Sequence, residues 1–125
     1  MRLGWAFNTR PFLYFCVMTR NIEILHKLKK LLQNTFGERI EDVVLFGSQA
    51  TNRQTIHSDY DVLIITKDVF NWKEKDQIRD LCYDLCLEYE IIIDSKIISR
   101  FEIENEFWGK HPLITDAINF GIHAR

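Results

Sequence analysis

Apolar residues recur along the chain at two different spacings, and these spacings predict helices and strands. From Asn21 to about Asn34, apolar side chains return every three or four positions, which is the repeat of one helix face. The same repeat runs through residues 73–89. Both segments are therefore expected to be amphipathic helices, the first one capped by Asn21. The apolar positions are Ile24, Leu25, Leu28, Leu31 and Leu32 in the first segment, and Ile78, Leu81, Cys82, Leu85, Cys86 and Tyr89 in the second.

Three apolar runs are short enough to be strands. They cover residues 43–46, 61–66 and 90–99. The last run is rich in isoleucine, a β-branched residue that favours strands. In that run, Ile92, Asp94, Lys96 and Ile98 are expected on one face of the strand, because side chains alternate between faces.

Two further helical signals complete the order of elements. Residues 47–54 have room for a helical turn that begins at Ser48. Pro112 opens the segment "PLITDAINF", and Gly121 is well placed to end a helix there. The resulting order of helices and strands predicts an α/β (α+β) fold, in which a small mixed β-sheet of three or more strands is flanked by helices.

The composition is that of one domain with its own core. The chain has 125 residues, of which 46% are hydrophobic and 27% are charged. Met18 precedes a good helix, so residues 1–17 are expected to be an N-terminal extension and residues 18–125 the domain. Arg10 and Pro11 interrupt the apolar segment ahead of Met18, which is also too short to span a bilayer. No membrane association is expected.

Charge and cysteine content narrow the class of protein further. The formal net charge of -2 gives no general attraction to nucleic acid. The three cysteines form no disulfide framework, which indicates a reducing, cytoplasmic setting. Cys82 and Cys86 are expected to be small core residues, because a zinc site would need further ligands near them.

Three aspartates lie at or inside the predicted strands. Asp59 and Asp61 are two positions apart and are expected to project together. Asp94 interrupts an isoleucine run, where an unpaired buried carboxylate would be unfavourable unless Lys96 or Arg100 paired with it. Three carboxylates from neighbouring strands would repel one another, and Mg²⁺ would offset the repulsion because it prefers oxygen ligands. The pattern favours metal-assisted phosphoryl or nucleotidyl transfer.

The pair Gly47-Ser48 supplies the complementary part of such a site. Glycine lets backbone approach a phosphate closely, and a helix start offers free N–H groups. The Ser48 hydroxyl adds a donor. Taken alone, the pair is also typical of a simple turn, and Asp59 is compatible with a turn or cap. Their combination with two further aspartates favours a binding site.

The motif "GSQA" followed by "SDYD" resembles the signature of the DNA polymerase β-like nucleotidyltransferase superfamily. Asp94 in "IIIDSKII" matches the third acidic position of that superfamily. The short length and the ending "ENEFWGKHPLITDAINFGIHA" are similar to its minimal nucleotidyltransferase group, and the resemblance covers roughly residues 20–123. One departure is that Thr51 and Asn52 stand where members often have a basic residue and glycine, with Arg53 one position on.

The resemblance implies a nucleotidyltransferase fold and a role for each matched residue. Gly47 and Ser48 would bind the triphosphate, while Asp59 and Asp61 would hold Mg²⁺. Asp94 would complete the metal site and help to activate the acceptor hydroxyl. The activity would move a nucleoside monophosphate, AMP from ATP, to that hydroxyl. Many minimal nucleotidyltransferases resemble the antitoxin of a pair with a HEPN-domain toxin, in which the acceptor is a tyrosine of the toxin.

Two other functions remain compatible with the sequence. A small-molecule nucleotidyltransferase, as in aminoglycoside modification, usually carries a second domain for the acceptor, and a homodimer or a partner would have to replace it here. A non-catalytic binding module would instead neutralise a toxin by covering it. Aromatic side chains favour such interfaces, and the candidates are Trp72, Phe101, Phe107 and Trp108.

Overall fold

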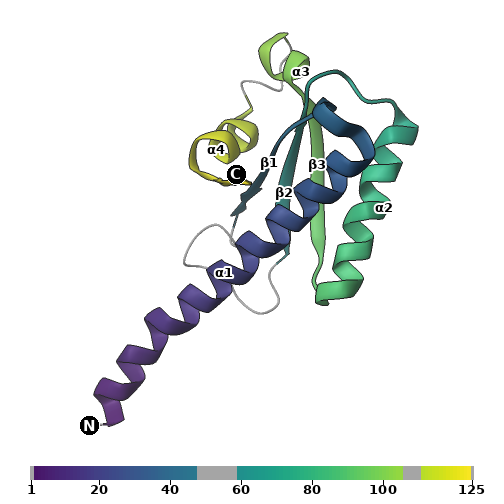
Figure 1. The fold of residues 1–125 in the computed structure, drawn as a ribbon. Coiled ribbons are helices and arrows are strands. Elements are labelled where there is room, and N and C mark those ends of the chain that lie inside the picture. The colour runs from purple at the N-terminus through teal and green to yellow at the C-terminus, as the bar shows by residue number, and fades with distance from the viewer. Residues whose placement is uncertain (1, 48–58, 106–110, 125) are drawn as a thin grey trace.

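A four-stranded mixed sheet with helices on both faces makes up the molecule (Figure 1). The computed structural model describes residues 2–47, 59–105 and 111–124, with backbone alone for residues 2–18. The elements are α1 (Arg2–Phe36), the 3-10 turn η1 (Gly37–Arg39), β1 (Ile40–Phe46), β2 (Tyr60–Thr66), α2 (Trp72–Tyr89), β3 (Ile93–Ser99), α3 (Arg100–Asn105), α4 (Pro112–Phe120) and β4 (Ile122–His123).

The strands lie in the order β3-β2-β1-β4. β2 runs antiparallel to β1 and parallel to β3, and β4 adds an antiparallel pair on the far side of β1. The predicted fold class, a small mixed sheet flanked by helices, is confirmed. The three predicted strands are present, although β1 begins earlier than expected, at Ile40, and β3 later, at Ile93.

Helices cover the two faces of the sheet and enclose two separate apolar clusters. α1 and α2 pack on one face, and α4 packs on the other (Figure 1). Because side chains alternate along a strand, β1, β2 and β3 each contribute to both clusters. The α1/α2 cluster includes Leu28, Leu32, Val43, Leu45, Val62, Ile64, Ile78 and Leu85, and the α4 cluster includes Val44, Phe46, Leu63, Ile65, Ile98, Ile114 and Ala117.

The first helix differs from the expectation at its N-terminal end. α1 is continuous from Arg2 to Phe36, so Asn21 lies inside the helix and the prediction that it caps a helix is wrong. Its side chain is buried, and the Tyr60 hydroxyl donates a hydrogen bond of 2.6 Å to its Oδ1 atom. Asn21 therefore serves the packing of α1 on β2. The boundary between residues 17 and 18 stays a prediction.

The later helices agree with the expectation more closely. α2 begins one residue before the predicted start, after Asn71, whose side chain and that of Glu74 form a capping box. α4 begins at Pro112, and Gly121 caps its C-terminal end, as expected. Within the described residues, no helix is long and apolar enough to cross a membrane.

α3 and β4 were not predicted from the sequence. With six and two residues, they are too short to show a periodic pattern. β4 exists as a strand because Ile122 and His123 pair with β1. The helical turn expected from Ser48, together with Phe107 and Trp108, lies outside the described residues.

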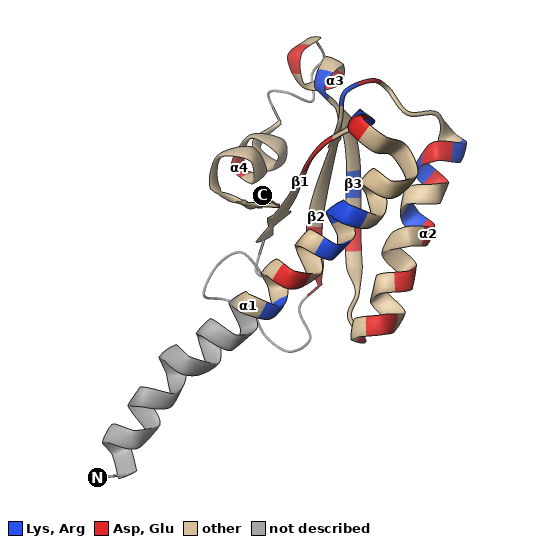
Figure 2. Cartoon of the chain, viewed as in Figure 1, with Lys and Arg blue, Asp and Glu red and all other residues tan. Residues whose placement is uncertain are grey.

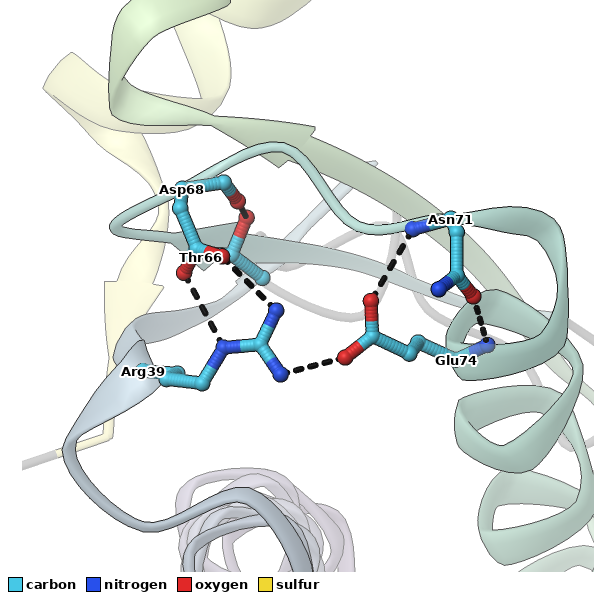
Figure 3. A network of polar contacts seen from close by, with 5 residues as sticks. All are labelled: Arg39, Thr66, Asp68, Asn71 and Glu74. Carbon is cyan, nitrogen blue, oxygen red and sulfur yellow. Dashed lines mark hydrogen bonds and ion pairs between the residues drawn. The ribbon is translucent and has the colours of Figure 1, made fainter.

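An ion-pair network ties the start of β1 to the start of α2 (Figure 3). Arg39 donates to both carboxylate oxygens of Asp68, at 3.1 and 2.7 Å, and also to Glu74. Its guanidinium carbon lies 4.2 Å from the centre of the Phe70 ring. Glu74 is at the same time the second half of the α2 capping box, bonding the Asn71 backbone N–H at 3.1 Å. One arginine thus holds the β2–α2 connection in place.

Candidate active site

The parallel pairing of β2 and β3 places Asp61 beside Asp94. The two residues are direct partners in the register, and each is the second residue of its strand. Register partners share a face, and here it is the face that carries Leu63 and Ile98, which α4 covers further along. Figure 2 shows acidic segments of β2 and β3 at the same end of the sheet. Two of the three predicted aspartates are therefore neighbours.

Asp59 lies one residue before β2 and is exposed. Asp59 is nonetheless close enough to Asp61 to affect its ionisation. Burial raises the pKa of Asp61, the carboxylates of Asp94 and Asp59 raise that pKa further, and Lys96 opposes them. Asp59 and Asp94 thus both lie within electrostatic reach of Asp61, and a cation bound beside it would relieve the repulsion.

Gly47 lies directly against the Asp61 carboxylate. It follows Phe46, the register partner of Asp61 on β1. A Cβ atom at Gly47 would stand 2.4 Å from Oδ2 of Asp61, and the backbone has a φ of +74°, which L side chains rarely adopt. Glycine is therefore required here for both space and conformation. Ser48, the other half of the predicted phosphate-binding pair, lies outside the described residues.

Asp94 is more open than its isoleucine neighbours suggested. Its side chain is 54% exposed, and Lys96 Nζ lies 3.4 Å from its Oδ2. The expected cost of burial does not arise, because β3 is an edge strand and Asp94 stands near its beginning. Of the two proposed ion-pair partners, Lys96 is the one present, since Arg100 pairs with Glu41 at 2.8 Å.

The acidic residues fit a magnesium ion in the way that proteins usually bind one. Among the described residues, no three His, Cys, Asp or Glu side chains form a closed metal cage. Mg²⁺ seldom needs such a cage, because one or two carboxylates suffice when water and substrate phosphates supply the other ligands. The neighbouring Asp61 and Asp94, with Asp59 close by, offer carboxylate oxygens of this kind.

A cavity of about 470 Å³ opens along β3 next to Lys96. Lys75 and Arg79 of α2 also line it, from the face of the sheet that α1 and α2 cover. Neither residue was assigned a role from the sequence. Only the packing of α2 beside β3 identifies them, and no local signal in the sequence does so.

Comparison with known proteins gives a family match and a relative of similar length. The family described as "Polymerase beta, Nucleotidyltransferase" matches residues 26–111. The relative named "Putative protein adenylyltransferase MJ0141", from Methanocaldococcus jannaschii, is 34% identical over 103 residues, which cover 82% of this chain and 97% of the relative.

Solved structures share the fold at low sequence identity. A toxin-antitoxin structure with AMP-PNP has a TM-score of 0.53 and 14% identity, covering 80% of this chain and 72% of the other. A mutant of the toxin-antitoxin pair MntA-HpeT has a TM-score of 0.52 and 12% identity over the same shares. At 14% and 12% identity, these similarities show a shared fold and nothing about activity.

Proposed function

The chain belongs to the Polymerase beta nucleotidyltransferase family, and from this premise we propose that it moves AMP from ATP to a hydroxyl group of a partner protein. The partner proposed is a HEPN-domain toxin, and the metal is Mg²⁺. The observation that carries the proposal is the register pair Asp61 and Asp94, with Gly47 packed against the Asp61 carboxylate. In the proposal, this arrangement would bring a metal-binding edge and a phosphate-binding turn together.

The relatives support the finer parts of the proposal. The name of MJ0141 describes a protein adenylyltransferase, and its alignment covers almost all of that protein. One structure with the same fold is a toxin-antitoxin complex with AMP-PNP, an ATP analogue. Both point to an adenine nucleotide and a protein partner for this chain.

The position of each described site residue supports the role that the proposal gives it. Asp59 and Asp61 would hold the metal, and Gly47 would let backbone N–H groups approach the triphosphate. Asp94 is half exposed, so an acceptor arriving from solvent can reach its carboxylate, which would take the hydroxyl proton. The acceptor oxygen then bonds to the α-phosphorus as the bond to pyrophosphate breaks. Bound Mg²⁺ would stabilise the charge on the attacking and leaving oxygens.

The test uses ATP labelled at the α-phosphate, Mg²⁺ and the co-purified partner. Label is expected on the partner with the native chain, and the Asp59→Asn/Asp61→Asn variant should lose it. Asp80→Asn/Asp84→Asn is the matched control, because both residues are exposed on α2 and lie away from the site. The control should label the partner as the native chain does.

A non-catalytic antitoxin predicts a different outcome. Trp72 and Phe101 are 70% and 54% exposed, which suits a surface that binds a partner through aromatic side chains. If the native chain transfers no label, and the Asp59→Asn/Asp61→Asn variant still neutralises the toxin, the binding module is the correct function and transfer is not.

A further inference from the structure

The outer edge of β3 borders the cavity described above. Four consecutive residues of the strand line it, Ser95 to Ile98. Consecutive residues of a strand point to opposite faces, so a cavity that touches all four reaches the strand edge. Leu63 of β2 lines it too, which shows that the cavity also extends over the α4 face of the sheet. α2 contributes lining residues from one face of the sheet, and α4 contributes them from the other. The cavity is thus an elongated groove beside an edge strand, which we call the β3 groove.

The middle of β3 directs backbone groups into this groove. Tyr60 donates its N–H to the Ile92 carbonyl at 2.8 Å, which sets the phase of the parallel ladder. Alternate residues, Ile93, Ser95, Ile97 and Ser99, therefore turn their N–H groups away from β2. Cys86 Sγ accepts from Ile93 N–H, and the Glu102 carboxylate accepts from Ser99 N–H.

Ser95 and Ile97 lie between these two bonded ends. In the described part of the chain, no hydrogen bond from another element reaches their backbone N–H groups. Backbone donors and acceptors that repeat every second residue along an open edge match the backbone of another extended chain. The groove geometry therefore suits a peptide segment that adds to the sheet beside β3.

The charges around the groove determine which side-chain charge a bound segment should carry. Lys75, Arg79 and Lys96 line it, against one described carboxylate, Glu102. Glu102 is already engaged with the Ser99 N–H. Apolar side chains of Ile97 and Ile98 supply the remaining contacts. Two of the cations have carboxylate partners outside the lining, Asp76 for Arg79 and Asp94 for Lys96. Because three cations and one carboxylate line the groove, a segment with acidic side chains would be favoured over a basic one.

We propose that the β3 groove binds the acceptor protein through an extended, acidic segment that pairs with Ser95 and Ile97. Asp94 directly precedes Ser95, so a segment in this register passes the site carboxylates and can carry a hydroxyl side chain to them. This inference rests on the proposed function, and it specifies how the acceptor reaches the site.

The test uses the isotope-labelled full chain and two synthetic peptides, without nucleotide. Each peptide has an extended sequence that contains one tyrosine. Every second residue is Glu in one peptide and Lys in the other. The Glu peptide should shift the amide resonances of Ser95 and Ile97, and the Lys peptide should not. Lys75→Glu/Arg79→Glu should weaken binding of the Glu peptide by about tenfold, as expected for loss of exposed ion pairs and new repulsion. Lys30→Glu/Lys67→Glu, at exposed positions elsewhere, should leave its affinity unchanged.

A second pair of variants tests the backbone contact. Ser95→Pro removes the N–H that points into the groove, and proline is tolerated at such positions of an edge strand. Ser95→Ala keeps the N–H and, like the proline variant, loses the hydroxyl. The Glu peptide should bind the alanine variant and not the proline variant. Should Ser95→Pro fail to fold by circular dichroism, the charge-reversal pair decides alone.

Three results would overturn the inference. These are no binding of the Glu peptide at millimolar concentration, shifts at residues outside the groove, and displacement of the peptide by ATP, which would make the groove a nucleotide subsite. Failure of the proposed function can be distinguished from failure of this inference. If no label is transferred while the peptide still binds, transfer is wrong and the docking edge remains. If label reaches the partner equally well in Lys75→Glu/Arg79→Glu, transfer stands and the docking edge is wrong.

Discussion

At the scale of single residues, the site depends on how closely backbone and carboxylate approach each other. Gly47 and Asp61 are in such close contact that no other residue type fits at position 47 without a shift. The carboxylate that it touches is also the most buried of the three aspartates, which is why burial is the main cause of its raised pKa. The glycine and the aspartate therefore act as one structural unit.

Replacing Gly47 tests this unit. Gly47→Ala would place a Cβ atom 2.4 Å from Oδ2 of Asp61, so the carboxylate must move. We expect label transfer to fall by at least about tenfold, the effect of a misplaced catalytic group. The measurement is transfer rate together with urea denaturation of the purified variant.

Gly37→Ala is the control for backbone strain. Gly37 has a φ of +64°, but nothing lies within 4 Å of an added Cβ. Both variants should lose about 1 kcal/mol of stability from the left-handed conformation. Only Gly47→Ala should lose activity, and an equal loss in both would show that contact with Asp61 is not what matters.

The cysteines provide a second test at this scale. Cys82 is buried, as predicted for a core residue, and burial raises the pKa of its thiol to about 11. Since the thiolate is the reactive form, Cys82 should resist iodoacetamide at mildly alkaline pH in the native state and react once urea unfolds the chain. Peptide mapping by mass spectrometry measures how much of Cys82 is alkylated. Rapid labelling of native Cys82 would contradict the buried position.

At the scale of elements, a network of ion pairs and hydrogen bonds supports the connection from β2 to α2. Arg39 lies at the end of η1, yet it bonds Asp68 beyond β2 and Glu74 in the first turn of α2 (Figure 3). Its hydrogen bonds are the main cause of the lowered pKa of both Asp68 and Glu74. The network joins segments that are 29 and 35 positions apart in sequence.

This network should make stability depend on pH. Carboxyl groups whose pKa is lowered in the folded state contribute stability above their unfolded pKa values, 3.8 for Asp68 and 4.5 for Glu74, and lose it as the pH falls through the folded values. Arg39→Gln should therefore lower the urea midpoint at neutral pH, with a difference from the native chain that shrinks in acid.

Arg79→Gln is the matched control for the network. Arg79 forms one ion pair with Asp76, three positions earlier on the exposed side of α2. Exposed pairs of this kind contribute little, so the urea midpoint should hardly change at either pH. A drop as large as that of Arg39→Gln would mean that any lost surface charge destabilises the chain.

At the scale of the whole molecule, the strand order decides which residues are accessible. Among the described strands, β1 and β2 are central, and β3 is an edge strand whose one neighbour is β2. Placing β3 at the edge exposes Asp94 and opens the β3 groove. The same order brings Asp61 and Asp94 together, because parallel neighbours begin at the same end of the sheet.

Hydrogen exchange should report this arrangement residue by residue. Every amide of β2 faces a bonded neighbour, in β1 or in β3, so protection should be continuous along it. Along β3, Asp94, Lys96 and Ile98 should be protected, while Ser95 and Ile97 should exchange at least about tenfold faster. Equal protection throughout β3 would contradict its position as an open edge.

Hydrophobic periodicity by itself determined much of the element order. The amphipathic face of α2, the buried run of β2 and the Pro112 start of α4 were all predicted correctly, because each depends on burial that a local pattern records. The alternation that places Asp94 and Lys96 on the face of Ile98 also follows from strand geometry alone. Asn21 was misjudged because its buried partner, Tyr60, is 39 positions away.

Tertiary structure alone decided how these elements meet. No local pattern specifies that β3 pairs with β2 in parallel, that Asp61 stands opposite Asp94, or that Lys75 and Arg79 border the β3 groove. Strand pairing joins residues far apart in sequence, and it is selected by the packing of whole faces against α1, α2 and α4. The sequence therefore indicated which residues are candidates for the site, and the sheet order determined which of them lie side by side.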